Sequence, residues 1–104
     1  MIPKVMRPFV FELQKATETD KLAWYEGYER AYVCDHKNHT LHIRSHFNEE
    51  NGESEFIFNL VTGEKNTPFT VKDGESDYDS MRDLYESVIA NANDVSKDIE
   101  DFFD

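Results

Sequence analysis

The hydrophobic period changes at Asp73-Gly74, and this change constrains the fold of the 104-residue chain more than any other feature. Before it, apolar residues recur at every second position, which is the period of a half-buried strand. After it they follow the three-and-four spacing of one helix face, at Met81, Leu84, Tyr85, Val88, Ile89 and Ala92. We therefore expect an α+β fold, with a small antiparallel β-meander of three to five strands packed against a long C-terminal helix or helix pair.

The strands are predicted from alternation and from the turns between them. Alternating segments lie at residues 28–36, 40–47, 56–60 and 69–71, with polar or glycine-containing stretches between them. In the second segment, Leu41 and Ile43 are expected to face the core. In the first, Val33 is expected to face the core and Cys34 the solvent.

The register of the first hairpin depends on the length of its loop. A three-residue loop at 37–39, with Asn38 or His39 in the left-handed region, pairs Val33 with Ile43 and Cys34 with His42. A two-residue turn would instead pair Val33 with His42 and mix apolar with polar side chains. We prefer the three-residue loop.

Both ends of the chain allow two interpretations. Phe9, Phe11 and Leu13 alternate like a strand, which we prefer, whereas Phe9, Leu13 and Ala16 would suit a helix beginning near Pro8. At the other end, Ser76 is expected to cap the helix. The apolar stripe then continues at Val95, Ile99 and Phe102, although Asn91, Asn93 and Asp94 are poor helix formers that could divide the segment into two helices.

Length and composition favour one folded domain covering residues 1–104. The size is typical of a single domain, and 13% aromatic residues supply apolar surface for a core. A single cysteine cannot form an internal disulfide framework, and no apolar run is long enough for a signal peptide or a membrane span. We expect a cytoplasmic protein that does not bind membranes.

All four histidines and the only cysteine lie within residues 34–46. Cys34, His36 and His42 are the candidate metal ligands, because thiolate and imidazole both bind zinc. The usual paired ligand spacing is absent, and Arg30 and Arg44 would repel a cation, so we interpret the segment as a solvated hairpin face. No glycine-rich phosphate loop or nucleophile motif occurs, and we predict neither an enzyme nor a cofactor.

Acidic residues dominate the C-terminal third. The net charge is −11, and residues 73–104 contribute −9 of it through 2 Lys/Arg and 11 Asp/Glu. Such a charge repels nucleic acid and anionic membranes and attracts basic proteins. Carboxylates recur at helical spacing in two triplets, and an aromatic pair follows them; the predicted partner-binding residues are Asp79, Asp83, Glu86, Asp94, Asp98, Asp101, Phe102 and Phe103.

These features favour a small acidic inhibitor that binds a basic, nucleic-acid-binding protein without touching nucleic acid itself. Rows of carboxylates could mimic DNA and block a nuclease, a CRISPR effector or a repair enzyme, as phage and mobile-element proteins do. The alternative is a non-catalytic structural or regulatory homodimer assembled through the C-terminal helix. For the apolar C-terminal residues, packing within the chain against Phe9 or Trp24 is a further possibility, and the acidity could serve solubility alone.

Overall fold

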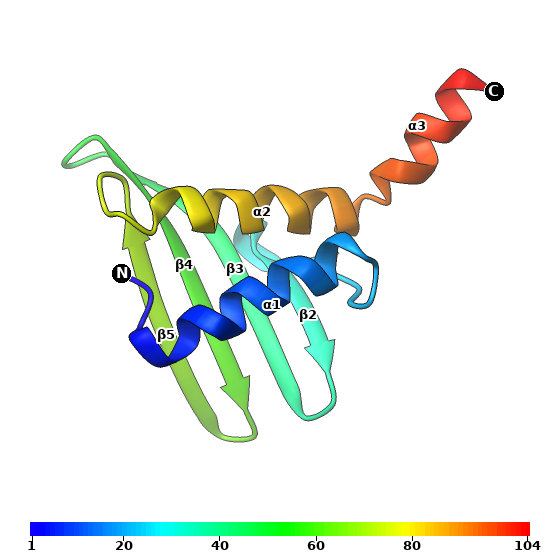
Figure 1. The fold of residues 1–104 in the computed structure, drawn as a ribbon. Helices are drawn as coiled ribbons and strands as arrows, with labels where there is room; N and C mark the ends of the chain where they lie inside the picture. The colour runs from blue at the N-terminus through cyan, green and yellow to red at the C-terminus, as the bar shows by residue number, and fades with distance from the viewer.

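A computed structural model describes residues 1–104 and shows an antiparallel sheet with two helices side by side on one face (Figure 1). The strands follow one another across the sheet in chain order: β1 (Tyr25–Glu26), β2 (Tyr32–His36), β3 (His39–Asn48), β4 (Glu53–Thr62) and β5 (Lys65–Lys72). The helices are α1 (Arg7–Glu18), α2 (Tyr78–Ala92) and α3 (Val95–Phe103), with short 3-10 turns η1 (Lys4–Met6) and η2 (Tyr28–Arg30). The α+β meander is thus confirmed.

The core lies between the sheet and the α1–α2 layer. Ile43, Phe58 and Val71 project from neighbouring strands and are fully buried. Leu84 and Val88 of α2 meet them from above with no exposed surface. Full burial of each such side chain stabilises the fold by roughly 1.5–3 kcal/mol, so this contact between α2 and the sheet dominates the stability of the domain.

The N-terminal segment is helical, and our preferred strand interpretation is wrong. Met6, Val10, Leu13 and Thr17 share the side of α1 that packs on the core, all at most 7% exposed. Phe11, whose alternation with its neighbours suggested a strand, is 63% exposed on another side. The buried stripe follows the helical period, and tertiary packing of that stripe decides the element.

The first hairpin has the register that we rejected. His36 pairs with His39 across a two-residue turn, so Cys34 lies opposite Leu41 and Val33 opposite His42. The left-handed residue in the turn is Lys37, with φ of 58°, rather than Asn38 or His39. Since side chains alternate between the two faces, this register turns Cys34 toward the helices, where it has no exposed surface.

Each face of β2 carries one buried and one exposed side chain, which explains why the alternation argument failed. Val33 is only 7% exposed although its side chain points away from the helices. The backbone at Gly27 covers it so closely that a Cβ added there would lie 2.9 Å from the Val33 Cγ2 atom. Gly27 is therefore required by close packing. The exposed side chains of Asp35 and His36 lie on opposite faces of β2, so they do not define its orientation.

A buried carboxylate joins the N-terminus to the start of α2. Asp77, only 5% exposed, accepts hydrogen bonds from the Ile2 backbone N–H at 2.9 Å and from both terminal nitrogens of Arg7 at 2.6 and 3.0 Å. Helix α2 starts directly after it, at Tyr78, so Ser76 is not the cap that we predicted. The paired hydrogen bonds with Arg7 satisfy the buried charge.

Asn91, in the last turn of α2, fixes the segment between α1 and β1. Its side-chain oxygen accepts the Trp24 backbone N–H at 2.9 Å, and its side-chain nitrogen donates to the carbonyls of Thr17 at 3.1 Å and Leu22 at 2.8 Å. An asparagine that is unfavourable by helix propensity is thus retained by these three tertiary hydrogen bonds and by a longer one to the Asp20 carboxylate at 3.4 Å.

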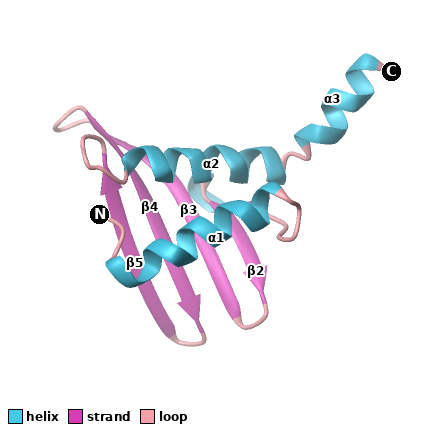
Figure 2. Ribbon diagram, viewed as in Figure 1, coloured by secondary structure: helices cyan, strands magenta, loops and turns pink.

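The C-terminal region forms a helix pair and not one continuous helix. The chain leaves the helical path at Asp94, whose φ of 50° and ψ of 47° lie in the left-handed region, and α3 then projects away from the sheet (Figure 2). No residue of α3 is buried, and the predicted packing against Phe9 or Trp24 does not occur. The stripe from Tyr85 to Phe102 is consequently split into a packed half and an unpacked half.

Candidate functional site

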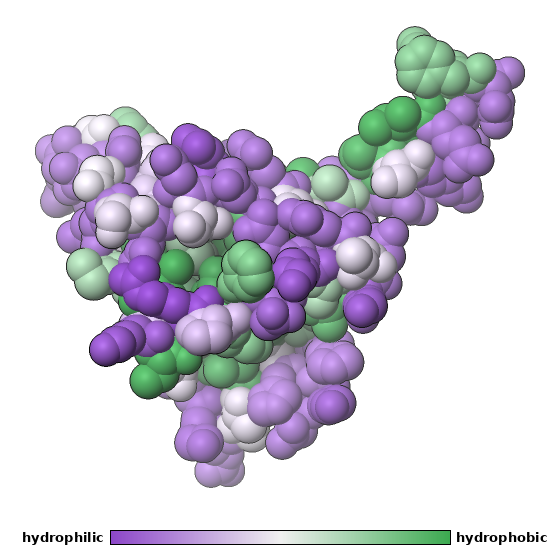
Figure 3. Space-filling model, viewed as in Figure 1, coloured by the Kyte–Doolittle hydropathy of each residue, from purple (hydrophilic) through white to green (hydrophobic).

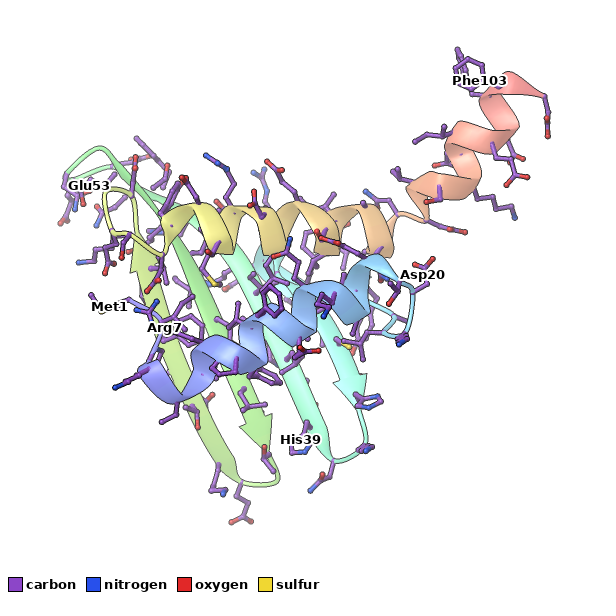
Figure 4. The ribbon with its side chains drawn as sticks, in the orientation of Figure 1. Met1, Arg7, Asp20, His39, Glu53 and Phe103 are labelled. Carbon is purple, nitrogen blue, oxygen red and sulfur yellow. The ribbon has the colours of Figure 1, made fainter.

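Helix α3 presents large apolar side chains to solvent. Ile99 is 56% exposed, Phe102 80% and Phe103 81%, and the two phenylalanine rings meet edge to face with centroids 5.0 Å apart. Together with Val95 these residues border one shallow depression, which we call the α3 apolar face. Figure 3 shows apolar side chains along one side of the projecting helix, and Phe103 lies at its outer end in Figure 4. Exposed aromatic residues grouped in this way are typical of protein-binding surfaces.

Carboxylates border the α3 apolar face. Asp98, Glu100, Asp101 and Asp104 are all exposed, and Lys97 is the only basic residue of the helix. By the helical period, Asp98 and Asp101 adjoin one edge of the apolar face and Glu100 the other. The helix therefore combines apolar anchors with a negatively charged rim, the arrangement of many protein interfaces.

The predicted acidic triplet of α2 lies on the solvent side of its helix. Asp79, Asp83 and Glu86 are exposed, as their spacing indicates. The Asp79 carboxylate forms an ion pair with Arg82 at 3.2 Å, so one of the three negative charges is partly offset. Both partners are about half exposed or more, and such a pair contributes little to stability.

The second triplet is not a continuous row. Asp98 and Asp101 share one side of α3, whereas Asp94 lies in the left-handed turn before the helix begins. The turn also changes the direction of the chain, so the carboxylates of α2 and α3 do not form one straight line (Figure 1). Of the predicted partner-binding residues, the structure groups Asp98, Asp101, Phe102 and Phe103 on one short helix.

The candidate metal ligands are separated by the sheet. Cys34 and His36 belong to the helix-facing side of β2, whereas His42 points to the opposite face, beside Val33. No group of three or more histidine, cysteine or acidic side chains is arranged to hold a metal ion. Burial raises the pKa of the Cys34 thiol and the neighbouring Asp35 raises it further, so the thiol is kept in its unreactive protonated form.

The four histidines divide into two pairs. His36 and His39 lie on the helix side at the end of the first hairpin, and the Nδ1 atom of His39 is 2.8 Å from the Thr62 hydroxyl. His42 and His46 lie on the uncovered side, where His46 contacts Glu55 at 3.0 Å. The dense sequence cluster of histidines therefore does not form a spatial cluster.

The uncovered side of the sheet holds a small carboxylate network. Asp35 accepts hydrogen bonds from the Tyr25 hydroxyl at 2.7 Å and the Thr40 hydroxyl at 2.9 Å. These two bonds, that of Tyr25 first, hold the pKa of the Asp35 carboxyl below its ordinary value, and the same bond raises the pKa of Tyr25. The network ties β1 to β2 and β3 at the edge of the sheet.

A groove that was not predicted from the sequence lies on the helix side, between α1 and the hairpin ends of the sheet. It encloses about 340 Å³ and has an almost wholly apolar lining. We call it the hairpin groove, and its lining residues are Phe9, Leu13, Leu22, His36, His39, Leu41 and Leu60. Only the helical placement of Phe9 together with the inward orientation of His36 and His39 could have revealed it, and both required the tertiary structure.

No protein-family model, curated protein or solved structure matches this chain. None of its helices has the length and apolar character needed to cross a membrane. The physical features of the surface therefore carry the functional interpretation.

Proposed function

We propose that this protein is a small acidic inhibitor that binds a basic, nucleic-acid-binding protein through helix α3. One observation carries the proposal: α3 holds an exposed apolar face, bordered by carboxylates, that the rest of the chain does not cover. Isolated from the core, this face contributes little to folding. It is instead available to a partner, whose pocket would bury the Phe102 and Phe103 rings.

The charge density of α3 supports a nucleic-acid mimic. Four carboxylates occur within residues 98–104, a length of about 9 Å at roughly 1.5 Å per residue. One strand of DNA carries a charge about every 3.4 Å, so the helix has a comparable density of negative charge. A basic groove that binds phosphates would attract α3 in the same way, and blocking of a nuclease, a CRISPR effector or a repair enzyme is the proposed result.

The apolar face distinguishes the proposed inhibitor from a purely electrostatic mimic. Phosphate backbones offer no aromatic anchors, so the partner would need an apolar pocket beside its basic residues. Binding of Phe102 in such a pocket would supply affinity that survives at physiological salt, where exposed charges are largely screened. The carboxylates would then mainly speed and orient association.

A homodimer along the Tyr85 to Phe102 seam is the weaker proposal. Its continuous helix would have to run through Asp94, which is left-handed, and Val88 in its first half is already buried in the core. Pairing of this kind would therefore require α2 to leave the sheet. The structure favours a contact made by α3 alone.

Capture of partners by immobilised protein, followed by mass spectrometry, tests the proposal. Wild-type protein should retain a basic nucleic-acid-binding protein that a variant with Phe102→Ser and Phe103→Ser does not retain. Added nucleic acid should release the captured protein by competition. Equal capture by both forms, or a captured protein that nucleic acid does not displace, would contradict the inhibitor proposal.

A further inference from the structure

We propose that the hairpin groove is a docking site for helix α3 of a second copy of this chain, so that two copies exchange their α3 helices. The groove and the α3 apolar face are two separate apolar surfaces, and neither is covered within one chain. Each has the property that the other lacks: one is concave, and the other is a projecting helix with aromatic side chains. Docking a helix in a groove is a common recognition mode.

The groove is open because the sheet extends farther than α1. The hairpin ends of β2–β3 and β4–β5 continue beyond the helix layer (Figure 1), and His39 lies at this end (Figure 4). Leu41 and Leu60 face each other across β3 and β4 there, and Phe9 overhangs them from α1 with 37% of its surface exposed. A volume of about 340 Å³ is at the small end of ligand pockets and suits one or two aromatic side chains.

Charge complementarity selects α3 as the occupant. A row on the helix-facing side of the sheet crosses the open end of the groove, where His36 pairs with His39, His39 with Thr62, and Thr62 with Lys65. Lys37 lies in the adjoining turn, and Glu64 in the next turn is the one acidic residue of the two hairpin turns. This end of the sheet therefore carries more basic than acidic residues in and directly beside its turns.

The opposite end of the sheet shows the contrast. Its turn between β3 and β4 carries Glu49 and Glu50, and Glu53 follows immediately. Docking there would place the carboxylates of α3 against like charges. At the hairpin end, Asp98 and Asp101 would instead approach Lys37 and Lys65. These two lysines lie next to His36 and to Thr62, beside the apolar groove.

Size favours a reciprocal exchange. One nine-residue helix, about 13 Å long, covers less than a stable interface requires, whereas two helices in two grooves around a twofold axis double the contact. The left-handed turn at Asp94 holds α3 away from its own body, so the helix is already extended toward a neighbour. The net charge of −11 on each copy opposes association at low salt, and about 0.15 M salt screens that repulsion beyond roughly 8 Å.

This inference does not rest on the proposed inhibitor function. If both hold, the dimer covers the α3 apolar face and a basic partner must displace it. Self-association is measured on the purified protein alone, and partner capture on a mixture, so failure of one leaves the other unaffected.

Cross-linking between two single-cysteine variants tests the exchange. Asp104→Cys places a thiol at the exposed end of α3 and keeps both aromatic anchors, and Thr67→Cys places one on the exposed, helix-facing side of β5, opposite Leu60 of the groove. Asn66→Cys is the matched control, because Asn66 is the exposed neighbour that points to the other face of the sheet. Cys34 has no exposed surface and should not react, which the wild-type chain verifies.

One variant is labelled with heavy isotopes and mixed with the unlabelled second variant and a short bismaleimide, at about 0.15 M salt. We expect mixed dimers, in which one labelled chain is cross-linked to one unlabelled chain. We expect about tenfold more mixed product with Thr67→Cys than with Asn66→Cys, because docking raises the local concentration of the two thiols. Equal yields from both pairs would overturn the proposal. So would an Asp104→Cys chain that links mainly to a second Asp104→Cys chain, since α3 would then pair with α3.

Two further results complete the test. A chain carrying both Asp104→Cys and Thr67→Cys should give cross-linked dimers. An internal cross-link, of monomer mass and formed at high dilution, would show that α3 folds into its own groove, contrary to the exchange. Sedimentation of the unmodified wild type should show a dimer at high protein concentration. A monomer at all concentrations would overturn the proposal even if traces of cross-linked product appeared.

Discussion

Helices α2 and α3 continue one apolar pattern, yet they have opposite environments. Met81, Leu84 and Val88 of α2 have no exposed surface, while Ile99 and Phe102 of α3 remain more than half exposed. The pattern of apolar residues is therefore sufficient to predict a helix and to identify its apolar side. It does not identify the surface that provides the contact, and for α3 no surface within the chain does so.

The largest expected difference between the helices concerns stability. Replacing Leu84 with Ala leaves a cavity in the core and should cost about 2–5 kcal/mol of unfolding free energy. The matched change Ile99→Ala in α3 should stay within about 0.5 kcal/mol at protein concentrations low enough for the chain to be monomeric, because within one chain it removes no buried contact. Urea unfolding of both variants measures this directly. A loss above about 2 kcal/mol for Ile99→Ala would show that α3 is already buried in solution, as in a dimer.

For partner binding we expect the opposite order, with the larger loss from substitutions in α3. Phe102→Ala should weaken binding to a captured basic partner by about 2–4 kcal/mol, as expected for a central aromatic anchor, while leaving the melting temperature unchanged. Phe47→Ala provides the control, because Phe47 is 57% exposed but lies on β3. Titration calorimetry of both variants separates the two positions. Equal losses for both would remove α3 as the binding helix.

The boundary between the packed and the unpacked helix is defined by Asn91. Asn91→Ala removes the bonds to Trp24, Thr17 and Leu22 and should cost about 1–3 kcal/mol of unfolding free energy. Asn93, two residues later, is exposed and makes no side-chain hydrogen bond, so Asn93→Ala should be nearly neutral. Thermal unfolding of both variants measures the two losses of unfolding free energy. Equal losses would show that the packed part of the helix does not end near Asn91.

The predictable part of the fold is the part in which one face alone is buried. In residues 56–60 and 69–71 the alternating apolar side chains are Phe56, Phe58, Phe69 and Val71, and they face the core as predicted. The apolar stripe of α2 faces the core as well. The predicted orientation of β2 is wrong because Val33 and Cys34 are both buried, on opposite faces of the strand. Alternation then does not show which face points to the core. The turn also uses a left-handed lysine, a residue that sequence rules do not favour there.

The candidate site was predictable to a similar extent. The exposed α3 residues follow from their spacing and from the poor helix formers before them, although Asp94 was wrongly joined to their row. Nothing local could reveal the hairpin groove, because it forms where Phe9 of α1 meets Leu41 and Leu60 of the sheet. Contacts between residues far apart in sequence are fixed only by the packing of the whole chain.

The two acidic rows should differ in their contribution to binding. Changing Asp98 and Asp101 to Ser should weaken partner binding and reduce its salt dependence, because these carboxylates border the anchors. Changing Asp79, Asp83 and Glu86 together to Ser should also weaken binding, by at most about 1 kcal/mol per exposed pair formed. Affinities across a salt series provide the measurement. If the salt slope stays unchanged in both variants, neither row contacts the partner.

The smallest expected effect is a pH dependence of stability that arises in the sheet and not in α3. Hydrogen bonds from Tyr25 and Thr40 lower the pKa of Asp35 in the folded chain below its value in the unfolded chain. The folded state therefore binds the proton more weakly, so the stabilisation is complete above the unfolded pKa of about 4 and is lost as pH falls through the lower folded value. Asp35→Asn should accordingly be less stable than wild type at neutral pH, with a difference that shrinks in acid. A pH-independent cost of Asp35→Asn in urea unfolding would mean that its effect comes from packing and not from the charge.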